Sequence, residues 1–145
     1  MYRRILAPVD GSEFSECSLE HVKAIATGTR CPEVILLRVI ESPPHIPEKE
    51  EKAAEASARD YLDKLVKSLN LKETGTVVKT VIIRGRADEE ILDYADKNKV
   101  DLIIMSSHGR SGVSRWLFGS VTERVLGHSK VPVLVIRPAA CVVAR

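Results

Sequence analysis

Strand-like and helix-like segments alternate along this whole chain, and no other feature of the sequence constrains its fold as strongly. Five short apolar stretches have the length and the composition of β-strands. They are residues 4–9, 33–40, 77–83, 100–106 and 133–136. Residues 34–37 and 102–105 are apolar without interruption, which is typical of strands covered on both faces. The alternation favours an open, parallel α/β sheet with right-handed crossovers.

Helical patterns fill the intervals between these strands. Ser12 is suited to cap the first helix, which carries acidic residues in its first turn and an apolar face further on. Further helices are expected over about 49–69, after Gly85 and after Gly119. No long linker or second domain interrupts the pattern, so we expect residues 1–145 to form one domain.

Composition excludes several classes of protein. The chain has 22 Lys and Arg against 20 Asp and Glu, a net charge of +2 that argues against a broad basic surface for nucleic acid. No apolar run reaches the roughly 20 residues needed to span a bilayer. Cys17, Cys31 and Cys141 form neither a CxxC pair nor a disulfide framework. We therefore expect a cytoplasmic protein that binds neither nucleic acid nor membrane.

Two loops that would follow the first and fourth strands are rich in small and polar residues. They are residues 7–12 and residues 106–112, the second continuing to 119–122. In open α/β sheets, ligands bind beyond the carboxyl ends of the strands, where the strand order reverses. Gly109 and Gly112 allow backbone N–H groups to approach an anion closely, and residues 119–122 would open a helix whose first amides suit a phosphate. The loops therefore indicate a phosphate-bearing ligand.

Asp10 adds a carboxylate to the first of these loops. On the facing side of such a site it would hydrogen-bond a ribose hydroxyl, or hold a divalent cation beside the phosphates. Taken singly, each glycine and serine is better explained by a turn or a helix cap. The nucleotide hypothesis depends on their occurring together at neighbouring strand ends.

Five segments of the sequence together form a specific pattern, namely residues 5–12, 34–39, 101–110, 117–125 and 131–135. In these segments, and over essentially its whole length, the chain resembles the universal stress protein family. The ATP-binding branch of that family carries the motif G-x2-G-x9-G-(S/T). Here Ser106-x2-Gly109-x9-Gly119-Ser120 keeps the spacing but has serine in place of the first glycine. A positive φ at Ser106 would strain the serine by about 1 kcal/mol, whereas a negative φ would make the exchange nearly neutral.

The resemblance implies a Rossmann-like, adenine nucleotide alpha hydrolase-like domain: five parallel strands in the order 3-2-1-4-5, with helices on both faces. It implies ATP, with Mg or Mn, between the first and fourth strands. Asp10 would face the ribose and could hold the metal, while the backbone of Val39 would meet the adenine. The residues implied to bind the nucleotide are Pro8, Val9, Asp10, Val39, Ser106, Ser107, His108, Gly109, Arg110, Ser111, Gly112, Gly119, Ser120, Val121 and Thr122.

The resemblance also implies a homodimer that pairs the last strands of two chains. Such pairing would cover an apolar edge strand that is otherwise a liability. The residues of that strand are Val133, Leu134, Val135 and Ile136.

Three functional hypotheses are open. The first is an ATP-binding homodimer in stress response or signalling. The second, which Ser106 favours, is a dimeric interaction module of the same fold that holds no nucleotide. The third is a slow ATP hydrolase or phosphotransferase. No G-x-S-x-G elbow or zinc-ligand spacing is present, and His108 has no partnered nucleophile, so catalysis is not predicted.

Overall fold

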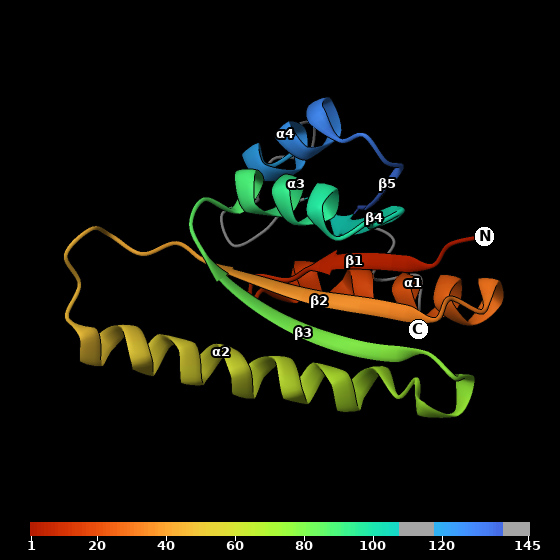
Figure 1. The fold of residues 1–145 in the computed structure, drawn as a ribbon, viewed down its shortest axis with the longest axis horizontal. Coiled ribbons are helices and arrows are strands. Elements are labelled where there is room, and N and C mark those ends of the chain that lie inside the picture. The colour runs from red at the N-terminus through yellow and green to blue at the C-terminus, as the bar shows by residue number, and fades with distance from the viewer. Residues whose placement is uncertain (108–117, 138–145) are drawn as a thin grey trace.

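Strands and helices alternate in the computed structural model, which describes residues 1–107 and 118–137 (Figure 1). The elements are β1 (Arg4–Pro8), α1 (Glu13–Thr29), β2 (Glu33–Ile40), α2 (Glu48–Leu69), a short 3-10 helix (Lys72–Thr74), β3 (Val77–Arg84), α3 (Ala87–Lys97), β4 (Leu102–Ser106), α4 (Ser120–His128) and β5 (Val133–Ile136). Each expected strand and helix is present. The largest difference in a strand boundary is at β4, which begins at Leu102 rather than at Val100.

The five strands form one parallel sheet in the order β3-β2-β1-β4-β5, as predicted. In the central strand, Leu6 lies beside Ile35 of β2 and Ile103 of β4. The chain therefore moves outward in one direction from β1 to β3 and in the other direction from β4 to β5. The reversal leaves a crevice at the carboxyl ends of β1 and β4, where α/β sheets bind ligands.

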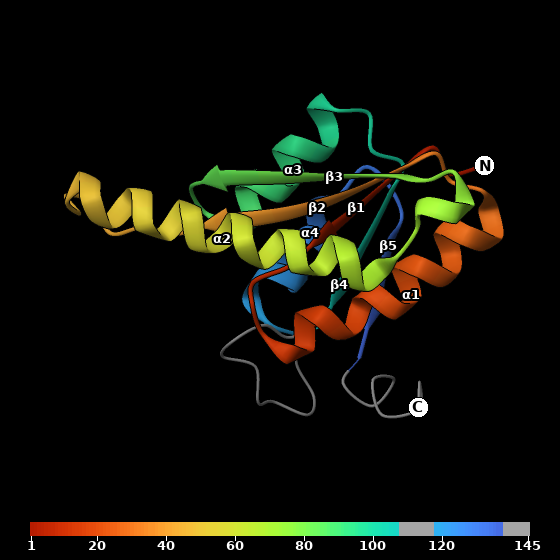
Figure 2. The same ribbon diagram turned by 90° about the horizontal axis from the view of Figure 1, so that it is seen from below.

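Helices cover both faces of the sheet (Figures 1 and 2). On one face, α1 and α2 pack their buried residues against alternate strand residues such as Ile5 and Leu36. On the other face, α3 and α4 pack against the intervening residues, such as Leu6 and Ile35. Because both faces are buried, the central strands can be apolar without interruption, as their sequences are.

Hydrogen bonds at both ends of the sheet hold the central strands in place. At the amino end, the Asp101 carboxylate accepts from the backbone N–H groups of Arg3 and Arg4, at 2.8 and 3.1 Å. At the carboxyl end, Val9 N donates to Leu37 O at 2.9 Å, so pairing with β2 continues one residue past β1. No helix within the described residues is long and apolar enough to cross a membrane.

Candidate functional site

The turn between β1 and α1 forms one wall of the crevice. The Asp10 Oδ1 atom accepts from Ser12 N at 2.9 Å, and Gly11 between them has a φ of 89° that favours glycine. Ser12 caps α1 by accepting from Ser15 N at 3.1 Å, and Ser15 Oγ accepts from Asp10 N at 3.1 Å. These bonds hold the partly exposed Asp10 at the carboxyl end of β1, where the nucleotide hypothesis needs it.

Two hydrogen bonds attach the start of α4 to the end of β4. Gly119 N donates to Ser107 O at 2.8 Å, and Thr122 Oγ1 donates to Ser106 O at 2.9 Å. Ser107 N in turn donates to Ile136 O on β5 at 2.9 Å. Ser106, Ser107 and Thr122 are all buried. The backbone carbonyls of Ser106 and Ser107, which accept from the Thr122 hydroxyl and from Gly119 N, therefore fix the position of α4.

Ser106 occupies the position of the first motif glycine without backbone strain. It is the last residue of β4 and pairs with Ile136 in the parallel ladder. Its backbone φ angle is not positive. An extended strand residue tolerates a Cβ atom, so serine at this position is close to neutral for the fold.

The first turn of α4 is open toward the crevice. Its N-cap is Gly119, with ordinary extended angles of φ −62° and ψ 159°, and no described side chain caps the helix. Ser120 is exposed, and Val121 is partly exposed. The first backbone amides of a helix need an acceptor, and an anion beyond the helix end would supply one.

Val39 directs its side chain away from the crevice and a carbonyl toward it. The side chain is buried on the α3–α4 face. Carbonyls of alternate strand residues point to the same neighbour, so Val39 O faces the side on which Leu37 O meets Val9 N. Because β1 ends there, Val39 O lies beyond the paired ladder. The Arg38 Nη1 atom donates to it at 2.7 Å, and a carbonyl oxygen has a second lone pair for a ligand.

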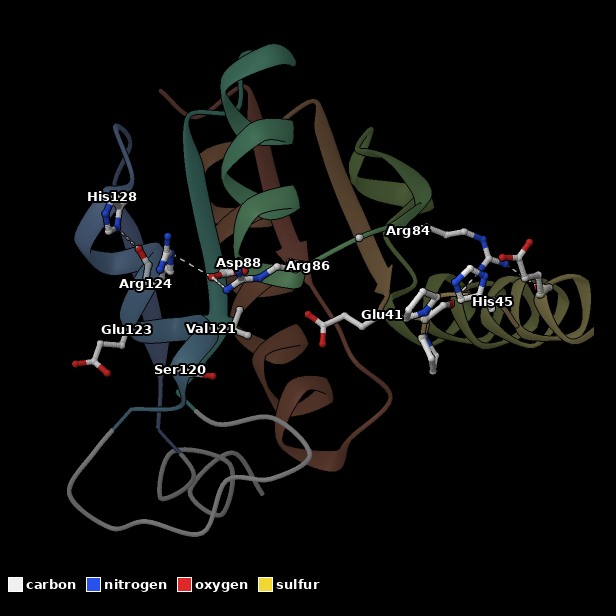
Figure 3. A pocket seen from close by; sticks show the side chains of 15 residues that line it. Glu41, His45, Arg84, Arg86, Asp88, Ser120, Val121, Glu123, Arg124 and His128 are labelled. Carbon is white, nitrogen blue, oxygen red and sulfur yellow. Dashed lines mark hydrogen bonds and ion pairs between the residues drawn. The ribbon is translucent and has the colours of Figure 1, made fainter. Parts of the chain in front are cut away.

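A groove of about 1070 Å³ adjoins this crevice and shares Ser120 and Val121 with it (Figure 3). It lies beyond the carboxyl ends of β2 and β3, between the β2–α2 loop and α4. The other residues that line it are Glu41, Ser42, Pro43, Pro44, His45, Glu51, Arg84, Gly85, Arg86, Asp88, Glu123, Arg124 and His128. Pro8, Val9, Asp10 and Val39 do not line it.

Interactions between distant segments shape this groove. The Glu41 carboxylate accepts from Ala87 N at 2.8 Å and so caps the start of α3. Arg84 donates to Glu55 at 3.1 Å, to Ser42 Oγ at 3.0 Å and to Glu51 O at 2.7 Å, which ties the β2–α2 loop to the end of β3. We did not predict these residues. The sequence signal that could have pointed to them is the Arg-Gly-Arg run at 84–86, directly after a strand.

The Tyr61 hydroxyl is buried next to the α1 side of the site. Tyr61 packs against the core beneath α1 and α2, and its hydroxyl has no hydrogen-bond partner among the described residues. Burial raises the pKa of Tyr61 to about 12, and the negative charge of Glu16 adds to the rise.

The predicted site residues divide into two groups. The structure brings Pro8, Val9, Asp10, Val39, Ser106, Ser107, Gly119, Ser120, Val121 and Thr122 to the carboxyl edge of the sheet. His108, Gly109, Arg110, Ser111 and Gly112 lie outside the described residues. Within the described part of the chain, no three His, Cys, Asp or Glu side chains group as metal ligands.

Comparison with known proteins identifies relatives along almost the whole chain. The sequence pattern of the universal stress protein family matches residues 1–137. The universal stress protein MJ0577 of Methanocaldococcus jannaschii is 36% identical in an alignment 157 residues long. The alignment covers 94% of this chain and 96% of that protein.

Solved structures share the fold. The structure of MJ0577 matches with a TM-score of 0.77 at 39% identity, covering 94% of this chain and 96% of that one. UspA from Lactobacillus plantarum matches with a TM-score of 0.80 at 28% identity, covering 94% and 98%. A universal stress protein family protein from Arabidopsis thaliana, solved with AMP bound, matches with a TM-score of 0.68 at 18% identity, covering 92% and 90%. At that identity the likeness concerns the fold alone.

Proposed function

This chain belongs to the universal stress protein family, and from that premise we propose that it binds ATP in the crevice between β1 and β4. We propose further that it acts as a cytoplasmic homodimer whose nucleotide occupancy changes its conformation or its choice of partner. The observation that carries the proposal is the first turn of α4, which no described side chain caps and which follows β4, while the Asp10 turn follows the neighbouring strand β1.

The described residues suit different parts of the nucleotide. Asp10 would accept a hydrogen bond from a ribose hydroxyl, and Val39 O would accept one from the amino group of the adenine. The amides of Ser120 and Val121 would donate to phosphate oxygens. Thr122 and Gly119 hydrogen-bond to the end of β4 and so hold α4 in place. The proposed site also includes Pro8, Val9, Ser106, Ser107 and Thr122. Residues 108–112, which lie outside the described residues, belong to the phosphate loop that the family resemblance implies.

A Mg or Mn ion would bind with the nucleotide rather than in a protein cage. Mg²⁺ commonly binds through one or two carboxylates and the phosphates of a substrate. The carboxylate of Asp10 at the carboxyl end of β1 fits that pattern. The ion would neutralise phosphate charge beside Asp10.

The interaction module that holds no nucleotide gains no support from backbone strain at Ser106, because Ser106 lies in an extended strand and has no positive φ. A relative of the same fold was solved with AMP bound, and another was solved with cAMP. These complexes support an adenine nucleotide as a ligand that the fold can accommodate.

Calorimetric titration of the purified chain with Mg-ATP tests the proposal. We expect saturable binding in the micromolar-to-millimolar range, with competition by AMP and no competition by inorganic phosphate at equal concentration. Analysis of nucleotide released on denaturation would reveal a ligand that co-purifies. A chain that binds neither ATP nor AMP, and that carries no nucleotide, would rule the proposal out.

The homodimer proposal rests on β5, for which β4 is the only neighbour among the described strands. Val133, Leu134 and Val135 on this edge strand are only partly buried. Pairing with a second β5 would satisfy the exposed backbone groups of the edge. Light scattering should give twice the chain mass, and Val135→Lys should reduce it to that of a monomer. A monomeric wild type would exclude the dimer without bearing on nucleotide binding.

A further inference from the structure

We infer that Arg124 binds the phosphate end of the ligand, as an additional anion-binding residue held in place by the buried carboxylate of Asp88. The inference rests on the proposed nucleotide function, and it assigns a role to a residue that the sequence pattern did not suggest. Arg124 lies on α4, and its side chain lines the groove that continues from the crevice (Figure 3).

Arg124 is placed on the side of α4 that a ligand at Ser120 would occupy. It follows Ser120 by four residues, so the two side chains lie one turn apart on the same helix face. The rise between them is about 6 Å at 1.5 Å per residue. Both residues line the groove, and an arginine side chain is long enough to reach across one helical turn.

The Asp88 carboxylate forms an ion pair with the Nε edge of the Arg124 guanidinium. Its side chain is 9% exposed, and Oδ2 lies 3.2 Å from Nε of Arg124. Oδ1 accepts from Glu89 N at 2.9 Å, which fixes the carboxylate at the start of α3. The Arg124 side chain remains 52% exposed, and neither Nη1 nor Nη2 donates to any residue that the structure describes. The guanidinium is therefore oriented in advance while its outer donors still face solvent.

The other two arginines of the groove are occupied. Arg86 places Nη2 3.4 Å from Asp88 and Nη1 3.6 Å from Glu89. Arg84 uses Nε, Nη1 and Nη2 on three different partners. Among the arginines that line the groove in the described structure, Arg124 alone keeps both Nη groups for a ligand.

The charge of the groove makes directed donors necessary. Its lining has four carboxylates, of Glu41, Glu51, Asp88 and Glu123, against three guanidinium groups. A phosphate would therefore not be attracted by a general positive field. It would be held by specific donors, and the paired Nη groups of an arginine match two phosphate oxygens.

Titration of the full chain with ATP, AMP and adenosine tests the inference. Arg124→Gln should weaken ATP binding about tenfold or more, equivalent to about 1.4 kcal/mol, and should leave adenosine affinity unchanged. Arg86→Gln is the matched control, because it removes a guanidinium from the same carboxylate and should change ATP affinity less than threefold. Arg124→Lys should recover part of the loss, since it keeps the charge without the fork.

Two outcomes would overturn the inference while the proposed function stands. One is an unchanged ATP affinity in Arg124→Gln. The other is an equal loss for ATP and adenosine, which would mean that Arg124 only positions α4. If the wild type binds no adenine nucleotide, the proposed function fails, and inorganic tripolyphosphate becomes the probe. Binding of tripolyphosphate that is lost in Arg124→Gln and kept in Arg86→Gln would still support the inference, and no binding by the wild type would overturn it. Circular dichroism confirms that each variant is folded.

Discussion

Helices α1 and α4 both begin at the carboxyl edge of the sheet, one after β1 and the other after β4, but their first turns are completed differently. At α1, Ser12 accepts from Ser15 N, and Asp10 and Ser15 hydrogen-bond further groups of the same turn. At α4, the N-cap is Gly119, and no described side chain caps the helix. Side chains of the turn satisfy the start of α1, whereas no described side chain satisfies the start of α4, where we propose that a ligand binds.

The difference has a simple origin in the residues that hold each helix. The hydroxyls of Ser12 and Ser15 turn back onto their own backbone. The hydroxyl of Thr122, in the first turn of α4, instead donates to Ser106 O in the sheet. Thr122 thus anchors α4 without covering its first amides. A binding site needs both properties, because the donors must be fixed in position and also unoccupied.

The largest effect is expected from giving α4 a cap of its own. In Gly119→Asp, the new carboxylate would accept from the amide of Val121 or Thr122 and would repel phosphate. Gly119 already has backbone angles that aspartate adopts readily. ATP affinity should fall about a hundredfold or more, from two lost charge-assisted bonds and the added charge. Stability should rise by a few tenths of a kcal/mol. Calorimetry and thermal unfolding measure both changes.

Gly119→Asn is the matched control for this variant. Its amide can cap the helix without a negative charge, so its ATP affinity should lie between those of the wild type and Gly119→Asp. If Gly119→Asp bound ATP as tightly as the wild type does, the open turn of α4 would not be the phosphate site.

Asp10 is the part of the closed turn that is expected to meet the ligand. In Asp10→Asn, the side-chain oxygen can still accept from Ser12 N, so the turn should persist while the charge is lost. Affinity for Mg-ATP should fall about tenfold, and the difference between titrations with and without Mg should shrink. Glu13→Gln removes an exposed carboxylate from the start of α1 and is the control. Equal losses in the two variants would point to a general charge effect instead.

Removing the α1 cap should separate stability from binding. Ser12→Ala loses the bond to Ser15 N and should destabilise the fold by about 1 kcal/mol, or about 2–4 °C in melting temperature. ATP affinity should stay within about twofold of the wild-type value. Gly119→Asp on α4 should show the reverse, with stability slightly raised and binding weakened. A similar pattern in both variants would contradict the division of roles between the two helix starts.

Much of this comparison could be predicted from the sequence. The uninterrupted apolar runs at 34–37 and 102–105 indicate strands covered on both faces, and both are buried. Ser12 could be identified as a cap because it precedes a helical pattern. The family resemblance supplied the strand order, and the structure has that order. These features depend on short-range patterns or on a motif with fixed spacing.

The groove could not be predicted in the same way. Glu41, Arg84, Asp88 and Arg124 come from four separate segments. Their meeting depends on β3 lying beside β2 and on α3 packing against α4. The sequence contains many charged residues, and nothing local distinguishes Arg124, with two open Nη groups, from Arg86, whose groups are occupied. The choice between them is made by side-chain geometry.

Restoring the motif glycine should not open the site further. Ser106 lies in extended strand backbone and is buried, so Ser106→Gly gains no conformational freedom that the site needs. It should instead lose about 0.5–1 kcal/mol of stability, because glycine orders at a higher entropic cost. ATP affinity should be unchanged. A clear gain in ATP affinity would show that the Ser106 side chain obstructs the phosphates at the end of β4.

The smallest predicted effect concerns the buried hydroxyl of Tyr61 and its response to alkaline pH. The Tyr61 hydroxyl is buried without a described partner, and its pKa is raised from 10.0 to about 12 by burial and by Glu16 in the first turn of α1. The folded chain therefore retains a proton that the unfolded chain releases. The resulting stabilisation is complete below pH 10 and is lost as the pH rises toward 12.

In the wild type, part of the tyrosinate absorbance should appear late in an alkaline titration, and the free energy of unfolding should fall across this window. Tyr61→Phe should remove the late component and flatten the fall. Tyr94→Phe is the control: burial also raises the pKa of Tyr94, but Tyr94 lies on α3, away from the start of α1. If Tyr61 titrated as an exposed tyrosine does, neither burial nor Glu16 would perturb its hydroxyl. The contrast with α4, where we expect an anion to bind, would then depend on the cap alone.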